Sequence, residues 1–303
     1  MIIKTSFTGI WITSSLVLWL NGEEMAEMGE ETEGPPENST LSSMGGYGVW
    51  HSAQDILSIF NGEEYQKLPG IRAVVSTYQE LLSQPSYDPH DDPPIDLRHP
   101  FIAVEGTHRD SRIILGKELA NYLRATYLGN PPRSMLPLRR LFDREKGMLR
   151  KAYFSLCMYV GAHHVRETWV REPVVTTGYW LDQAAFSIAQ RFSLMNLPPE
   201  GHPVYEYPED LVKPDVAFFL NIPSLRGSNK PPNPFKPKLV EVYRRLRGVK
   251  IVEINSTGTY RKIFEIIKTH LKFMFNNKDP VTEKNQLEFW DGDQYGHDNG
   301  FDM

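Results

Sequence analysis

The chain has 303 residues, of which 40% are hydrophobic and 12% aromatic, which is enough for one sizeable core with appendages. Its net charge of −5 and its pI near 6.0 argue against nucleic acid as a partner, because binding a phosphate backbone needs a basic surface. Cys157 is the single cysteine, so an internal disulfide and a cysteine-based zinc site are both excluded.

Residues 1–22 form a hydrophobic leader. Lys4 precedes an apolar stretch at 10–20, which has the length of a signal-peptide core and is short for a membrane span. A mitochondrial transit peptide should be rich in arginine and poor in acids, whereas the first arginine here is Arg72 and glutamates crowd residues 23–37. We therefore expect a secretory signal or anchor, with a merely apolar leader as the alternative.

Two stretches have the composition of linkers. Residues 23–48 are acidic and rich in glycine, proline and serine, and residues 85–100 are rich in proline and aspartate. Between them, a unit at 49–84 contains two short helical patterns, Ser52–Phe60 and Ile71–Leu82. The tail at 276–303 is polar and acidic, and we predict that it is disordered.

Strand and helix signals alternate from Phe101 to Phe275. After the strand that begins at Phe101, apolar strands are predicted at 125–128, 173–176, 216–220 and 250–254. Helices are predicted after Gly106 and at 147–170, 180–192, 237–247 and 260–275. Continuous apolar strands separated by helices indicate a parallel sheet that is covered on both faces.

The turn after the first predicted strand is a candidate site. Phosphate-binding loops at this place read G-x-x-x-x-G-K-S/T and cradle phosphate with backbone N–H groups. Here the window Gly106–Ile113 reads GTHRDSRI, so the first glycine is present and the second glycine, the lysine and the hydroxyl are absent. The residues alone leave two interpretations open, a degenerate phosphate loop and a simple surface turn.

Three further stretches carry a family resemblance: LFDREKGMLRKAYFSLCMYV, LPPEGHPVYEYPEDLVKPD and the GYW that follows the third strand. With the alternation of elements, they resemble the thymidylate kinase family, in its UMP–CMP kinase branch. The resemblance implies an α/β P-loop nucleoside monophosphate kinase fold at 101–275, a doubly wound parallel sheet of about five strands with helices on both faces. It also implies transfer of the γ-phosphoryl group of ATP, with Mg²⁺, to a pyrimidine nucleoside monophosphate.

The family's loop is altered at three positions. Ser111 stands at the second glycine, where a left-handed backbone would cost a side chain about 1–2 kcal/mol. Arg112 stands at the lysine and keeps the charge, but a planar guanidinium does not replace a compact ammonium. Ile113 stands at the magnesium-binding Ser/Thr and has no oxygen to offer. Arg109 and Arg112 still leave room for weak anion binding.

Two other parts of the family's donor site also differ. The resemblance implies Asp-Arg-Tyr after the third strand, where this chain has Thr177, Gly178 and Tyr179, so both charged groups are absent. It also implies a lid helix with arginines after the fourth strand. Here that segment is broken by proline, and Arg226 is the lid candidate.

The acceptor side keeps more of the family pattern. Pro131, Pro132, Arg139, Arg150 and Phe154 match positions that in the family shape the monophosphate pocket. Arginines contact phosphate through two N–H groups, and an aromatic ring stacks on a base. The alternatives are solvated helix charges for the two arginines and ordinary core packing for the phenylalanine.

A histidine pair suggests a metal site at first sight. His164 and Glu167 are three residues apart on a predicted helix, and His163 adjoins them. No third ligand at a useful spacing is apparent, so we predict no metal site.

Three hypotheses follow. We favour a nucleoside monophosphate kinase homologue with impaired transfer, which binds nucleotide or a protein partner and has weak or lost binding of ATP and Mg²⁺. The second hypothesis is an active UMP–CMP or thymidylate kinase with an unusual loop. The third is a secreted or membrane-tethered interaction protein on the same fold. The resemblance implies a mitochondrial or cytosolic compartment and often a dimer, but it names no protein partner.

Overall fold

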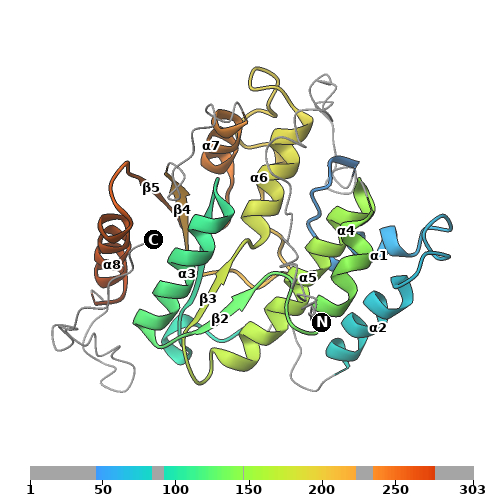
Figure 1. The fold of residues 1–303 in the computed structure, drawn as a ribbon, viewed down its shortest axis with the longest axis horizontal. Helices are drawn as coiled ribbons and strands as arrows, with labels where there is room; N and C mark the ends of the chain where they lie inside the picture. Colours follow the sequence, from blue (N-terminus) through green and yellow to red (C-terminus); the bar gives the residue numbers. More distant parts are fainter. Residues whose placement is uncertain (1–45, 84–91, 146, 223–234, 277–303) are drawn as a thin grey trace, which may run out of the picture.

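A computed structural model describes residues 46–83, 92–145, 147–222 and 235–276 (Figure 1). The leader, most of the first linker, the lid candidate Arg226 and the tail lie outside these ranges. In the part of the chain that is described, no helix has the length and hydrophobicity needed to cross a membrane.

Five parallel strands form the central sheet. They are β1 (Phe101–Gly106), β2 (Thr126–Gly129), β3 (Val174–Thr177), β4 (Val216–Asn221) and β5 (Ile251–Asn255). Their order across the sheet is β2-β3-β1-β4-β5, and every neighbouring pair is parallel. The predicted parallel sheet is therefore confirmed, with β1 at its centre.

Eight α-helices are described. They are α1 (Ala53–Phe60), α2 (Ile71–Leu82), α3 (Arg109–Leu123), α4 (Arg139–Asp143), α5 (Met148–Thr168), α6 (Trp180–Arg191), α7 (Lys236–Arg245) and α8 (Tyr260–Asn276). Each predicted helix is present with ends within a few residues of the prediction. The short α4 was not predicted, because five residues are too few to show a helical period.

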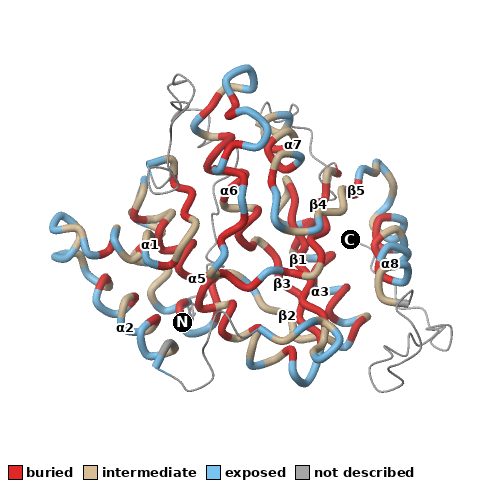
Figure 2. Tube along the Cα trace, turned by 180° about the vertical axis from the view of Figure 1, so that it is seen from behind, coloured by how far each residue is buried: buried red, intermediate tan, exposed pale blue. Residues whose placement is uncertain are grey.

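Each face of the sheet has its own hydrophobic core. Alternate side chains of β1 point into one core and then the other. Phe101 and Ala103 belong to the larger core, under α5, α6 and α7, while Ile102 and Val104 belong to the smaller core, under α3 and α8. The three inner strands, β1, β3 and β4, are almost wholly buried between these layers, whereas the edge strands β2 and β5 are only partly buried (Figure 2). The helical pair α1 and α2 packs on the outer side of α5.

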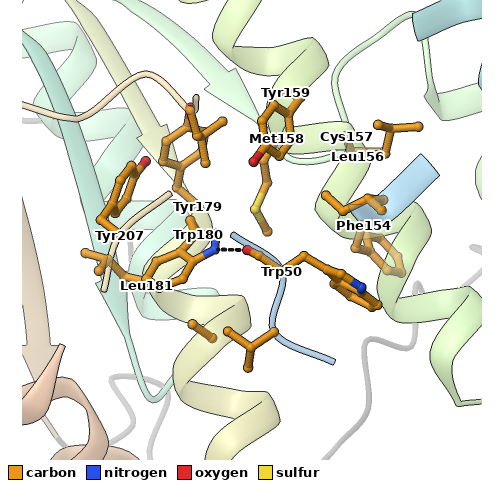
Figure 3. Packing of buried hydrophobic residues seen from close by; sticks show 14 of the residues in the cluster. Trp50, Phe154, Leu156, Cys157, Met158, Tyr159, Tyr179, Trp180, Leu181 and Tyr207 are labelled. Atoms are coloured by element: carbon orange, nitrogen blue, oxygen red, sulfur yellow. Dashed lines mark hydrogen bonds between the residues drawn. The ribbon is translucent and has the colours of Figure 1, made fainter. Parts of the chain in front are cut away.

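The segment before α1 is part of the larger core. The side chain of Trp50 is buried, and its carbonyl accepts a hydrogen bond of 3.0 Å from Trp180 Nε1 at the start of α6 (Figure 3). Ala53 N–H donates to Asp210 Oδ2 at 2.8 Å. The predicted linker extended to residue 48, but Tyr47 packs on Phe192 with ring centroids 5.3 Å apart. The helical pair and the sheet therefore share one core.

The described end of the second predicted linker is also anchored. Arg98 binds Asp215 through two hydrogen bonds of 2.8 and 2.9 Å, and it lies over the ring of Trp169. Asp215 Oδ2 in turn accepts the backbone N–H of Phe101 at 2.8 Å. This part of the predicted linker therefore fixes the start of β1.

Candidate functional site

The candidate site lies at the carboxyl edge of the sheet, at the ends of the neighbouring strands β1, β3 and β4. In open α/β sheets, ligands bind at this edge where the strand order reverses. Gly106 ends β1 with φ of +152°, and a Cβ atom there would lie 2.7 Å from the carbonyl oxygen of Leu220 in β4. The loop passes so close to β4 that only glycine fits at its first position.

The altered loop positions face the interior. α3 begins at Arg109, and Ser111 and Arg112 in its first turn are buried, whereas Ile113 is half-buried. The guanidinium of Arg112 forms an ion pair with Asp182 of α6. The side chain of Arg112 is 9% exposed, so the cation at the lysine position faces another side chain rather than solvent.

A buried acid lies beside this ion pair. Glu105 of β1 is fully buried, and its Oε1 accepts the backbone N–H of Tyr179 at 2.9 Å. Burial and then the charge of Asp182 raise the pKa of Glu105, against the opposing charge of Arg112, and the net value is about 8. Its Oε2 has no hydrogen-bond partner among the described residues. Glu105 is therefore uncharged near neutral pH, so the carboxylate of Asp182 alone balances the guanidinium of Arg112.

The degenerate motif after β3 joins the neighbouring loops. The hydroxyl groups of Tyr127 and Thr177 share a hydrogen bond of 2.6 Å, and Asn130 Nδ2 donates to the carbonyl of Gly178 at 3.1 Å. The ring of Tyr179 is buried against Phe101, with centroids 5.4 Å apart. These contacts are structural, and none places a charge at the edge.

The candidate acceptor residues come together although they derive from two helices. The guanidinium of Arg139 in α4 lies 6.0 Å from the ring centroid of Phe154, and that of Arg150 in α5 lies 5.7 Å from it. Asp143 lies between the arginines, at 3.1 Å from Arg139 Nε and 3.5 Å from Arg150 Nη2. The structure brings these residues together, and their role in binding phosphate stays a prediction.

Little room is left for a base beside them. The rings of Phe154 and Tyr153 pack edge to face with centroids 5.1 Å apart, and Phe154 is buried. A cavity of about 10 Å³ lies nearby, lined among others by Asn130, Met158 and Tyr179. Such a volume holds at most one water molecule. Pro131 and Pro132, the other candidate residues, are also buried.

The charge of Arg109 interacts with that of the acceptor residue Arg139. The sequence gave no sign of this interaction. Burial lowers the pKa of Arg109, and the charges of Arg139 and then Arg112 lower it further. Burial also lowers the pKa of His108, and the charges of Lys236 and Arg112 add to this effect. Cations from α3, α4 and α7 therefore repel one another at this edge, which makes it attractive to an anion.

Sequence reasoning missed three acids: Glu105 and Asp182 beside Arg112, and Asp143 beside the acceptor arginines. Glu105 gave a signal, since it is the single charged residue in an apolar strand and follows alternation onto the α6 face. Asp182 gave no such signal, because its partner Arg112 belongs to another helix. Asp143 gave none either, because it pairs with Arg139 within a helix too short to be predicted. His163 and His164 both contact Glu167, at 3.4 and 3.2 Å, and the described residues contain no cluster of three or more metal ligands.

A curated protein is similar to part of the chain in sequence. Over 123 residues the chain is 35% identical to "UMP-CMP kinase 2, mitochondrial" of Homo sapiens. The matching stretch is 40% of this chain and 27% of the human protein, so about a quarter of the relative's length is spanned. No model of a protein family matches the chain.

Solved structures of two thymidylate kinases are similar to part of the chain. The enzyme of Candida albicans has a TM-score of 0.42 at 15% identity, covering 57% of this chain and 93% of that structure. The enzyme of Ehrlichia chaffeensis has a TM-score of 0.41 at 12% identity, covering 57% and 98%.

Proposed function

We propose that this chain, part of which is similar to a UMP-CMP kinase, is a nucleoside monophosphate kinase homologue that binds a pyrimidine nucleoside monophosphate and transfers phosphate poorly or not at all. The observation that carries this proposal is the contrast between two sets of arginines at one edge. Arg112, on the donor side, is buried against Asp182. Arg139 and Arg150, on the acceptor side, flank one aromatic ring and are joined by a partly exposed acid.

The donor side lacks what phosphoryl transfer needs. In a working loop the lysine reaches the β- and γ-phosphates, and a hydroxyl next to it binds Mg²⁺. Arg112 already has an ion-pair partner, and Ile113 has no oxygen. The loop after β3 supplies Thr177 and Gly178 in place of charged groups. We therefore expect the binding of ATP and Mg²⁺ that is typical of the relatives to be weak or lost.

The acceptor side keeps a partner for a phosphate dianion. Arg139 and Arg150 both form an ion pair with Asp143. Arg109 forms one with the exposed Asp110, so in these pairs three guanidinium groups face two carboxylates. Arg139 Nη2 is buried without a hydrogen-bond partner among the described residues, which costs free energy until an acceptor arrives. A phosphate group can take two N–H groups from one arginine and displace Asp143, whose side chain is 30% exposed.

The base of such a ligand needs a rearrangement. The cavity beside Met158 holds about 10 Å³, far less than a pyrimidine ring occupies. Phosphate contacts should therefore supply most of the binding free energy, and affinity should differ little between CMP, UMP and dTMP.

Calorimetric titration of the full chain with CMP, UMP and dTMP tests the proposal. We expect heat of binding for the wild type and its loss in the double variant Arg139→Ala with Arg150→Ala. The control is Arg245→Ala, since Arg245 forms an ion pair with Glu241 at the same i, i+4 spacing, in α7, as Arg139 does with Asp143. The absence of heat for all three nucleotides, or an unchanged affinity in the double variant, contradicts the proposal.

A further inference from the structure

The ion pair of Arg112 and Asp182 crosses the carboxyl edge of the sheet. Arg112 belongs to α3, which covers one face, and Asp182 belongs to α6, which covers the other. Tyr243 of α7 adds its hydroxyl, which lies 3.3 Å from Asp182 Oδ1. Three helices from both layers thus meet at the residue that stands where a phosphate loop has its lysine.

The charges around Arg112 are balanced without any ligand. Asp182 and Glu105 are the acids that face the guanidinium, and burial keeps Glu105 protonated near neutral pH by raising its pKa to about 8. Burial, with Asp182 and Glu105 nearby, also raises the pKa of Tyr243, so its hydroxyl stays uncharged. An incoming phosphate would meet a neutral pair, with the carboxylate of Asp182 already on the cation.

We propose that Asp182 determines the specificity of the degenerate loop by excluding oligophosphates, because its carboxylate occupies the guanidinium of Arg112 that a phosphate would otherwise contact. The inference rests on the proposed function only in treating this loop as a former phosphate site. It adds a direct cause for the loss of donor binding, an internal anion. Absent glycine, lysine and hydroxyl groups weaken a site, whereas Asp182 closes it.

Burial of an arginine–aspartate pair is not by itself evidence for this role, as a second pair shows. Arg98 and Asp215 are 9% and 12% exposed, close to the 9% and 20% of Arg112 and Asp182. That pair lies at the opposite edge of the sheet, where Trp169 covers the guanidinium. Both are buried arginine–aspartate pairs, but only the pair of Asp182 lies at the carboxyl edge. Substitution of Asp215 is therefore a matched control for substitution of Asp182.

The probe is inorganic pyrophosphate, which carries the anionic groups of a donor without its base. The main variant combines Asp182→Asn with Glu105→Gln, because Glu105 would otherwise ionise and replace Asp182 on the guanidinium. We expect this variant to bind pyrophosphate about tenfold more tightly than the wild type, equivalent to about 1.4 kcal/mol. Adding Arg112→Gln should remove the gain. Asp215→Asn should show no gain.

Two results overturn the proposal. One is a folded main variant that binds pyrophosphate no better than the wild type. The other is wild-type binding of pyrophosphate that depends on Arg112. The variant Arg112→Met with Asp182→Leu tests the second outcome even if the main variant fails to fold, because apolar pairs often replace buried ion pairs without loss of stability. We expect its pyrophosphate titration to match that of the wild type, and a weaker one contradicts the proposal.

Titration of the same samples with CMP separates this inference from the proposed function. CMP binding should be unchanged by the substitutions at Asp182 and Glu105, since the acceptor arginines belong to α4 and α5. A chain that gains pyrophosphate binding but never binds CMP refutes the proposed function and supports the role of Asp182. If CMP binds but the main variant gains no pyrophosphate binding, the proposed function is supported and the role of Asp182 is refuted.

Discussion

Tyr179 donates its backbone N–H to Glu105 Oε1 over 2.9 Å, so the last residue of the degenerate motif after β3 binds the one acid buried within β1. The bond satisfies one carboxyl oxygen, and the other has no partner among the residues described. A carboxyl group in this position is more stable with its proton than without it.

We predict that Glu105 makes stability fall as the pH rises. Its pKa is about 8 in the folded chain against 4.5 ordinarily, so between these values the folded state holds a proton that the unfolded state has released. The contribution is fully present below pH 4.5 and is lost as the pH approaches 8. Urea unfolding at several pH values measures the slope. Glu105→Gln should flatten it, and an equal slope in that variant would refute the assignment.

We predict that Gly106→Ala destabilises the fold by about 1–3 kcal/mol. An added Cβ would lie 2.7 Å from the carbonyl oxygen of Leu220, and the backbone there has φ of +152°. The control is Gly129→Ala at the end of β2, where a Cβ would meet only Tyr127, at 3.9 Å. That change should stay within about 0.5 kcal/mol. Urea unfolding that finds equal effects for both variants would contradict the prediction.

We predict little stabilisation by ATP with Mg²⁺. A ligand at 100 times its dissociation constant stabilises a protein by about 2.7 kcal/mol, which thermal unfolding detects readily. Arg112 is already paired, and Ile113 cannot hold the metal. A magnesium-dependent stabilisation of that size at millimolar ATP would show that another group binds the metal.

We predict no phosphoryl transfer above background, measured as ADP formation with CMP, UMP or dTMP. The loss of an acid–base group typically costs about 10²–10⁴-fold in rate, and the loss of a phosphate-facing arginine can cost about 10³–10⁵-fold. Arg112→Lys alone should not help, because a lysine would meet the same Asp182. Turnover by the unmodified chain that Arg112→Ala abolishes would overturn this prediction.

Restoring the full family pattern faces a structural obstacle. Gly178 has φ of +70°, so an arginine there would take a left-handed backbone at a cost of about 1–2 kcal/mol. The set Ser111→Gly, Arg112→Lys, Ile113→Thr, Thr177→Asp and Gly178→Arg is therefore expected to give partial activity at most. Adding Asp182→Asn together with Glu105→Gln should raise that activity, which a rate comparison between the two sets checks.

The sequence predicted the elements well and the pairings poorly. Ile71–Leu82 was predicted with both ends correct, because its apolar positions recur at helical spacing and Gly70 precedes it. The Arg112–Asp182 pair joins residues that are 70 positions apart, and no local pattern encodes such a contact. Tyr47 and Gly48 were placed in a linker on composition, since glycine-rich sequence gives no sign of the core that it contacts.

The two arginine–aspartate pairs have a joint effect on β1. All six residues of this strand are buried, so its sequence has no polar face whose exposure would penalise a shift of one residue against β3 or β4. Asp215 binds the backbone of Phe101 at one end, and at the other end Glu105 is held by Tyr179 beside Arg112. The hydrogen bonds of Phe101 and Glu105 therefore fix both ends of the strand, in addition to the close fit of Gly106 against Leu220.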